Sequence, residues 1–235
     1  MSNIYFEFKQ FTVWQDKCAM KVGTDGVLLG AWVNIATAKN ILDVGAGTGL
    51  ITLMLAQRQR QAIITAVEID ELTASQAKEN VNHSPWKDQI KVVRLDFRFY
   101  DSVYKYDLIV SNPPYFINAL KCPDKQRNTA RHAGELNYEL LFQRSAELLK
   151  EEGNLAIIIP AEAEKAVINI AWKYKLYPQH LLKVFTKAGK PCRRVLLSFG
   201  FQERQCSEKE ICIQLDTNEF SSEYKSLVKD FYLKF

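Results

Sequence analysis

The sequence has 235 residues, of which 47% are hydrophobic and 25% are charged, and these values are ordinary for a soluble globular protein. Its formal net charge of +4 at pH 7 is compatible with a polyanionic partner, although many soluble proteins share such a surplus. No apolar run approaches the roughly 20 residues of a transmembrane helix, and the N-terminus lacks a signal-peptide pattern. We therefore expect a cytoplasmic protein with no membrane partner, and a monomer is the simplest expectation.

Five cysteines are scattered through the chain, which also has only three histidines. The odd number of cysteines and the lack of a C-x-x-C pair argue against a disulfide framework and against structural zinc. The sequence therefore predicts free thiols and no metal.

Residues 1–39 come before the regular pattern of the chain, and we interpret them as an N-terminal extension. Within it, Thr24-Asp25-Gly26 predicts the start of a helix, with Asp25 or Thr24 as the capping residue. Residues 40–235 are predicted to form the main domain, and the chain as a whole a single structural domain.

Short β-branched strands alternate with amphipathic helical segments between residues 40 and 200. The predicted strands are Asn40–Val44, Ile63–Ile69, Ile90–Leu95, Tyr106–Val110 and Leu155–Ile159. The predicted helices are Leu50–Arg58, Glu71–Asn80, Tyr138–Lys150 and Ala161–Lys173. This alternation is typical of an α/β fold, in which a parallel sheet is covered by helices on both faces.

The pattern changes towards the C-terminus. Leu181–Phe185 and Arg194–Phe199, joined by a basic turn with Gly and Pro, predict an antiparallel hairpin. Ile211–Leu215 is predicted to be a short extra strand, and Ser222–Phe231 a final helix.

A glycine loop follows the first predicted strand of the main domain. Gly45, Gly47 and Gly49 alternate between that strand and the next helix, where glycine lets the backbone turn tightly and approach a ligand. Asp43, at the carboxyl end of the strand, is better suited to a cationic ligand than to a pyrophosphate. The loop alone is compatible with several nucleotide chemistries.

Acidic residues also end the next two strands. Glu68, next to Ile69, follows the first glycine by about twenty residues, where a carboxylate can accept hydrogen bonds from two ribose hydroxyls. Asp96 can accept one from an adenine amine while Phe97 packs on the ring, although a strand-end aspartate often only caps the next segment.

Over roughly residues 20 to 200, these motifs resemble the class I S-adenosylmethionine-dependent methyltransferases. The resemblance implies a Rossmann-like fold with a mostly parallel seven-stranded sheet, a C-terminal antiparallel hairpin and helices on both faces. It also implies that S-adenosyl-L-methionine is the cofactor. The cofactor-binding residues that it implies are Thr24, Asp25, Asp43, Gly45, Gly47, Gly49, Glu68, Ile69, Asp96, Phe97 and Asn112. Thr24 and Asp25 would close the site from the N-terminal extension.

The motif Ser111-Asn112-Pro113-Pro114-Tyr115-Phe116 follows the strand Tyr106–Val110. The prolines end the strand, because neither can donate a ladder hydrogen bond. The Asn112 amide oxygen and the Pro113 carbonyl can then accept from the two N–H groups of a conjugated amine, which favours methylation of its nitrogen. Tyr115 offers a flat face for stacking. The predicted catalytic residues are Asn112, Pro113, Pro114 and Tyr115.

This motif resembles that of N-methyltransferases acting on adenine N6, on guanine N2 of ribosomal RNA, or on glutamine N5 of proteins. Further segments, among them Phe8-Lys9-Gln10-Phe11 and Lys21–Trp32, make nearly the whole chain similar to the bacterial tRNA(Val) adenine-N6 methyltransferases. That resemblance implies a tRNA partner and an adenine next to the anticodon as the target. A glutamine-N5 protein methyltransferase, a ribosomal guanine-N2 or DNA adenine-N6 enzyme, and a non-catalytic RNA-binding relic remain alternatives.

Two basic segments are candidates for contact with RNA phosphates, and either can equally be an ordinary solvated surface. One is the long polar segment after the motif, and the other is the hairpin turn. The residues predicted to bind the substrate RNA are Lys121, Lys125, Arg127, Arg131, His132, Lys190 and Arg193.

Overall fold

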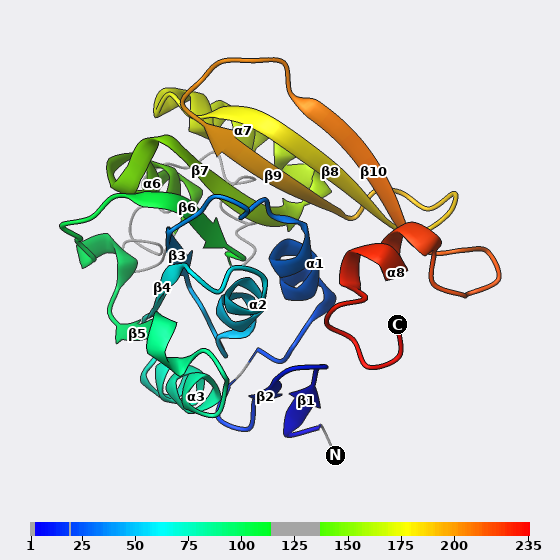
Figure 1. The fold of residues 1–235 in the computed structure, drawn as a ribbon. Helices are drawn as coiled ribbons and strands as arrows, with labels where there is room; N and C mark the ends of the chain where they lie inside the picture. The colour runs from blue at the N-terminus through cyan, green and yellow to red at the C-terminus, as the bar shows by residue number, and fades with distance from the viewer. Residues whose placement is uncertain (1–2, 19, 114–136) are drawn as a thin grey trace, which may run out of the picture.

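The computed structural model describes residues 3–18, 20–113 and 137–235. Its centre is an eight-stranded sheet in the order β10-β8-β9-β7-β6-β3-β4-β5, with helices on both faces (Figure 1). The strands are β3 (Asn40–Val44), β4 (Ile63–Glu68), β5 (Ile90–Arg94), β6 (Tyr106–Ser111), β7 (Leu149–Pro160), β8 (Tyr177–Lys187), β9 (Arg194–Gly200) and β10 (Ser207–Gln214). The α-helices are α1 (Thr24–Trp32), α2 (Leu50–Arg58), α3 (Glu71–Asn82), α6 (Tyr138–Leu148), α7 (Glu164–Lys173) and α8 (Ser222–Val228), and the short 3-10 helices are η1 (Lys87–Gln89), η2 (Phe97–Phe99) and η3 (Ala161–Ala163).

The pairing of the strands confirms the predicted α/β architecture. Strands β5, β4, β3, β6 and β7 are parallel, and β8 and β9 form the predicted antiparallel hairpin, with β9 against β7. The resemblance implied seven strands, and the eighth is β10, which pairs in parallel with β8 at the edge of the sheet. The predicted strand Ile211–Leu215 is the second half of β10, which begins at Ser207 and ends at Gln214.

The alternation of side chains along the strands divides the core into two layers. Ile41 and Leu108 point into the layer beneath α1 and α2, whereas Leu42 and Ile109 point into the layer beneath α6 and α7. Because both faces are covered, β3 is buried along nearly its whole length. At β3, a ligand can therefore be bound only beyond the end of the strand.

The N-terminal residues form a small antiparallel hairpin of β1 (Tyr5–Glu7) and β2 (Thr12–Trp14), which the sequence did not predict. It lies beside α3 in Figure 1. Its connecting residues contact the C-terminal segment: Phe8 stacks on Tyr232 with ring centroids 5.9 Å apart, and the Lys9 amide donates to the Phe231 carbonyl. Segments from the two ends of the chain thus pack together.

Candidate active site

Two neighbouring strands bring the glycine loop and the Asn112 motif to the same edge of the sheet. In the parallel pair β3–β6, Val44 lies opposite Ser111, and the Ser111 hydroxyl donates a hydrogen bond of 2.8 Å to the Val44 carbonyl. The chain continues from Val44 into Gly45 and from Ser111 into Asn112. Both predicted motifs therefore begin at adjacent positions, at the carboxyl ends of their strands.

The three glycines of the loop have left-handed backbone conformations, which are compatible with the tight turn that the sequence predicted. Gly45, Gly47 and Gly49 have φ values of +70°, +58° and +82°, which residues with a side chain rarely adopt. A Cβ atom at Gly45 or Gly47 would meet nothing within 4 Å, whereas one at Gly49 would lie 3.6 Å from Ala77 of α3. A Cβ at Gly49 would thus make only an ordinary contact with α3, so Gly49 is favoured by its positive φ, and Gly45 and Gly47 border open space.

Asp43 is fully buried directly before this loop. Its Oδ2 accepts a 2.6 Å hydrogen bond from the Thr52 hydroxyl, whereas its Oδ1 is buried without a hydrogen-bond partner. Burial raises the pKa of Asp43 to about 7, and the Thr52 hydrogen bond opposes this rise. A buried carboxylate with an oxygen to spare is a suitable acceptor for a cationic ligand. Sequence reasoning missed Thr52, although a polar residue within the apolar run of α2 is a usable signal.

Glu68 supports the glycine loop from the end of β4. Its Oε2 accepts from the Gly47 amide at 2.9 Å, and its Oε1 accepts from the Asp70 amide at 3.0 Å. A carboxylate has about four acceptor sites, so two remain for the hydroxyl groups of a ligand. Ile69, the next residue, is 57% exposed and offers an apolar contact beside the carboxylate.

Asp96 caps η2 and is largely engaged by Arg98. Its Oδ1 accepts from the Arg98 amide at 2.9 Å, and its Oδ2 accepts from Nε at 2.8 Å and Nη2 at 2.5 Å. The hydrogen bonds from Arg98 lower the pKa of Asp96 against the opposing effect of burial. Phe97 packs in the layer beneath α6 and α7 and is only 4% exposed, so it cannot present a whole ring face to a ligand. The capping interpretation of Asp96 thus holds in this structure, with room for one further hydrogen bond on Oδ1.

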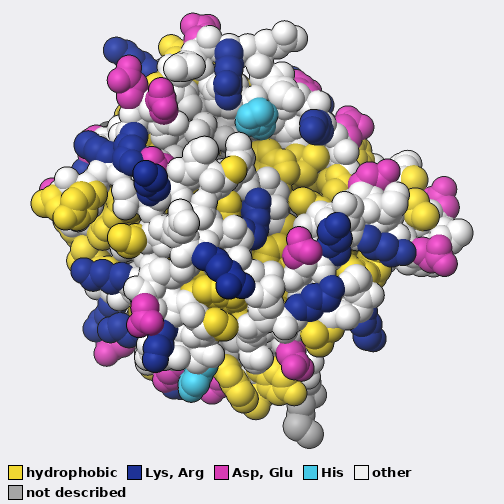
Figure 2. Space-filling model, viewed as in Figure 1, with side chains coloured by type: hydrophobic (Ala, Val, Ile, Leu, Met, Phe, Trp, Pro, Cys, Tyr) yellow, Lys and Arg dark blue, Asp and Glu magenta, His cyan; other side chains and the backbone are white. Residues whose placement is uncertain are grey.

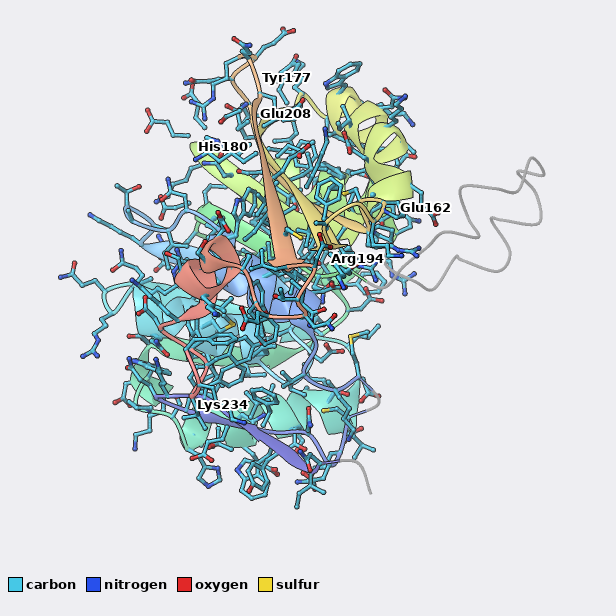
Figure 3. All side chains as sticks on the ribbon, turned by 90° about the vertical axis from the view of Figure 1, so that its right-hand side faces the viewer. Glu162, Tyr177, His180, Arg194, Glu208 and Lys234 are labelled. Atoms are coloured by element: carbon cyan, nitrogen blue, oxygen red, sulfur yellow. The ribbon has the colours of Figure 1, made fainter. Side chains whose placement is uncertain are left out.

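The start of α1 differs from the prediction. The helix begins at Thr24, but its N-cap residue is Gly23, without a side-chain capping hydrogen bond. The predicted capping by Asp25 or Thr24 is therefore wrong, because Asp25 instead accepts a 2.9 Å hydrogen bond from Arg194 Nε in an ion pair. Arg194 lies at the opposite end of the β8–β9 hairpin from Tyr177 (Figure 3).

The ion pair connects α1 with the active-site edge of the sheet. Arg194 is paired with Pro160, the last residue of the parallel strand β7, so that Asp25 lies at the same edge as the glycine loop. Tyr138, at the start of α6, is close enough for the positive charge of Arg194 to act on its pKa, which burial raises to about 12. Sequence reasoning placed Arg194 at the start of a hairpin strand and did not predict its contact with Asp25.

The substrate side of the site is only partly described. Asn112 is half-buried and Pro113 is buried at the end of β6. Two predicted catalytic residues, Pro114 and Tyr115, lie outside the described residues, as do the predicted RNA-binding residues Lys121, Lys125, Arg127, Arg131 and His132.

The other two predicted RNA-binding residues, Lys190 and Arg193, are exposed on the turn between β8 and β9. On the described part of the face in Figure 2, Lys and Arg side chains alternate with Asp and Glu side chains rather than forming one basic patch.

The described residues contain no group of three or more His, Cys, Asp and Glu side chains that would hold a metal ion. Cys18, Cys192, Cys206 and Cys212 are free, as predicted. Among the same residues, no helix combines the length and the apolar character that a bilayer crossing requires.

Comparisons with known proteins show to which family the chain is similar. Residues 20–171 match the model of the methyltransferase small domain family. The chain is 53% identical over 234 residues to the tRNA1(Val) (adenine(37)-N6)-methyltransferase of Bacteroides thetaiotaomicron, covering 99% of both chains. It is 51% identical over 237 residues to the protein of the same name in Bacteroides fragilis, covering 100% of both. Among solved structures, a predicted O-methyltransferase from Agrobacterium tumefaciens superposes with a TM-score of 0.72 at 16% identity, covering 88% of this chain and 96% of that one.

Proposed function

This chain belongs to the methyltransferase small domain family and, within it, to the family of the tRNA1(Val) (adenine(37)-N6)-methyltransferases, and on that premise we propose that it methylates N6 of adenine 37 in tRNA1(Val). The observation that carries the proposal is the identity of 53% across 99% of both chains. The position of Asn112 beside the glycine loop supports it. We place the reaction in the cytoplasm.

We propose S-adenosyl-L-methionine as the methyl donor, because the described residues fit its parts. Asp43 has a buried oxygen without a partner, suited to the ammonium of the methionine part. Gly45 and Gly47 border open space, and Glu68 has acceptor sites left for two ribose hydroxyls. Ile69 and the remaining site on Asp96 Oδ1 would contact the nucleoside. When bound, this cofactor supplies a methyl group already activated on a sulfonium.

The work of the protein is then to orient the accepting amine. The exocyclic amine of adenine is a poor nucleophile, since its lone pair is conjugated with the ring. The Asn112 side-chain oxygen and the Pro113 carbonyl would each accept one of its N–H groups, which would favour a more tetrahedral nitrogen and stabilise the positive charge that develops on it. The hydrogen bond from Ser111 to Val44 fixes the start of this loop relative to Asp43.

The tRNA would contact the protein mainly through its phosphates. Lys190 and Arg193 are exposed on the β8–β9 turn, directly before Arg194, which lies at the active-site edge. We propose that these two cations hold the phosphate backbone while the target adenine leaves its stack and enters the site.

The function is tested by incubating the purified protein and labelled S-adenosylmethionine with tRNA from cells that lack the modification, and in parallel with ribosomal RNA and with a protein extract. We expect label in tRNA. Mass analysis of its nucleosides should give N6-methyladenosine, and mass analysis of nuclease fragments of the tRNA should place this base at position 37. Label in protein glutamine would favour the glutamine-N5 alternative, and methylguanosine in ribosomal RNA the guanine-N2 alternative. Tight RNA binding without any methyl transfer would identify a non-catalytic relic.

A further inference from the structure

The N-terminal hairpin and the glycine loop share one buried side chain, Asn80 of α3. Its Oδ1 accepts from the Trp14 amide at 2.8 Å, and its Nδ2 donates to the Trp14 carbonyl and the Thr48 carbonyl, both at 2.9 Å. The side chain is 1% exposed, and its bond to the Thr48 carbonyl is buried, whereas the two bonds to Trp14 are partly buried. One amide therefore satisfies the backbone of β2 on one side and the glycine loop on the other.

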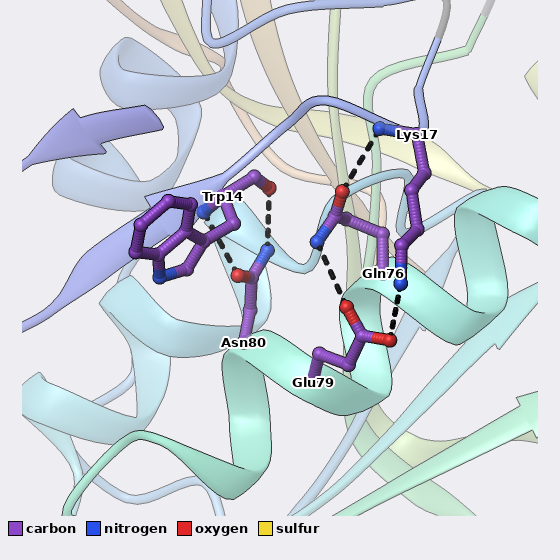
Figure 4. Close-up of polar contacts among 5 residues, drawn as sticks. All are labelled: Trp14, Lys17, Gln76, Glu79 and Asn80. Atoms are coloured by element: carbon purple, nitrogen blue, oxygen red, sulfur yellow. Dashed lines mark hydrogen bonds and ion pairs between the residues drawn. The ribbon is translucent and has the colours of Figure 1, made fainter. Parts of the chain in front are cut away.

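The hairpin is attached to α3 by a row of side chains (Figure 4). The amide oxygen of Gln76 accepts from the Lys17 amide at 3.0 Å, and the Glu79 carboxylate forms an ion pair of 2.5 Å with the Lys17 amino group. Gln76, Glu79 and Asn80 are three and four residues apart, so they lie on one face of the helix. Together they bind the chain from Trp14 to Lys17, and only Asn80 also contacts the loop.

The contact with Thr48 fixes the orientation of one peptide group in the glycine loop. The Thr48 carbonyl and the Gly49 amide belong to the same planar unit. Asn80 holds its carbonyl, and the Gly49 amide donates to the Ala46 carbonyl at 2.9 Å. Without Asn80, the buried Thr48 carbonyl would lack this partner, and the freedom of Gly49 on one side of the peptide would let it rotate.

We infer that Asn80 is a positioning residue through which the docked N-terminal hairpin holds the glycine loop in the conformation that binds the cofactor. The inference rests on the proposed function only in that the ligand of the loop is S-adenosylmethionine. According to this inference, the segment before α1 contributes to the free energy of cofactor binding without contacting the cofactor. By linkage, cofactor binding must then also stabilise the docked hairpin.

The test compares two substitutions on the same face of α3. Asn80→Ala and Gln76→Ala each remove an amide that is 1% exposed and that binds the backbone of the hairpin, but only Asn80 reaches the glycine loop. Calorimetry should show that Asn80→Ala raises the dissociation constant of S-adenosylmethionine on the order of tenfold more than Gln76→Ala does. The KM for tRNA should stay within about twofold of the parent value in both variants.

Hydrogen exchange on the unmodified protein provides a second measurement that does not depend on how the variants fold. Addition of S-adenosylmethionine should slow exchange of the Trp14 and Lys17 amides, which bond to α3 side chains, and leave amides of β10 unchanged. Equal dissociation constants of S-adenosylmethionine for the two variants would overturn the inference. Exchange rates of the Trp14 and Lys17 amides that do not change when the cofactor is added would overturn it as well. In either case, a positive methylation assay would leave the proposed function intact. A parent protein that binds no S-adenosylmethionine would overturn the proposed function and this inference together.

Discussion

Replacement of Asp43 by asparagine should stabilise the cofactor-free protein at neutral and alkaline pH. Asp43 is fully buried, and burial raises its pKa from 3.8 to about 7. The folded protein therefore binds a proton more tightly than the unfolded chain does between these two values. Its stability decreases as the pH rises through this range, because an ionised carboxylate must be kept in the interior.

The size of the effect follows from the shift. A shift of about 3 pKa units at 1.36 kcal/mol each means that ionisation of Asp43 can lower the free energy of unfolding by at most about 4 kcal/mol. Roughly 2.5 kcal/mol of this decrease falls between pH 5 and pH 8. The Asp43→Asn variant carries no titrating group at this position, so this part of the pH dependence should disappear. In this variant, the Thr52 hydroxyl can still donate to a side-chain oxygen, because asparagine has the same shape as aspartate.

The assay is urea unfolding of parent and variant in the absence of cofactor, at several pH values between 5 and 8. The difference in unfolding free energy between the two proteins should grow in favour of the variant as the pH rises. Asp107→Asn is the control: burial opposes ionisation there, but the hydrogen bonds from Lys150 and from the Asn40 and Lys39 amides outweigh it and lower the pKa of Asp107. Asp107 therefore titrates below pH 5, so Asp107→Asn should change the free energy of unfolding by the same amount at every pH between 5 and 8.

Parallel pH profiles of parent and Asp43→Asn would refute the reasoning, since they would mean that Asp43 does not titrate between pH 5 and 8. The same substitution should weaken S-adenosylmethionine binding and remove the increase in affinity that we expect for the parent between pH 5 and 7. Asp43 is thus expected to lower the stability of the free enzyme while it contributes to ligand binding.

Three further predictions concern the proposed roles of single residues. Asn112→Ala should lower the methylation rate by roughly 10²-fold or more and leave the calorimetric affinity for S-adenosylmethionine nearly intact, and an equal loss of affinity would show that Asn112 acts mainly on the cofactor. Glu68→Ala should weaken cofactor binding by roughly 10²-fold, because it removes a charged acceptor and the support of the Gly47 amide, and an unchanged dissociation constant would reject the ribose assignment. Replacement of both Lys190 and Arg193 by alanine should weaken tRNA binding and make its salt dependence shallower, whereas identical salt slopes would remove this turn from the RNA surface.

The parts of the fold that depend on local pattern were predicted closely. The strand Asn40–Val44 and the helix Leu50–Arg58 have the predicted bounds, and the glycines between them form a tight turn with positive φ values. These elements could be predicted because the composition of each segment and the glycines of the turn determine them without contacts from distant residues. The predicted helix Ala161–Lys173 is divided into η3 and α7, and the predicted Tyr138–Lys150 ends at Leu148 because β7 begins at Leu149.

The features that sequence reasoning missed depend on contacts between distant residues. Strands β1 and β2 have three residues each, and their support comes from Asn80 and Tyr232 rather than from their own pattern. Strand β10 pairs in parallel with β8. Its sequence could not predict this direction, because buried and exposed side chains alternate in the same way in parallel and antiparallel strands. Likewise, Asp25 has the sequence position of a capping residue, and only the fold brings Arg194 to it.

The contact between the two ends of the chain has a consequence for biosynthesis. Lys9 donates to the carbonyl of Lys229, a residue 220 positions later, and Phe8 stacks on Tyr232. The N-terminal residues of these pairs leave the ribosome long before the C-terminal residues are synthesised, so the hairpin lacks these contacts during most of translation. If the hairpin helps to hold the glycine loop, a nascent chain gains its full affinity for cofactor only when the segment after α8 has emerged. Unfinished copies of the enzyme would then bind the methyl donor more weakly than finished ones.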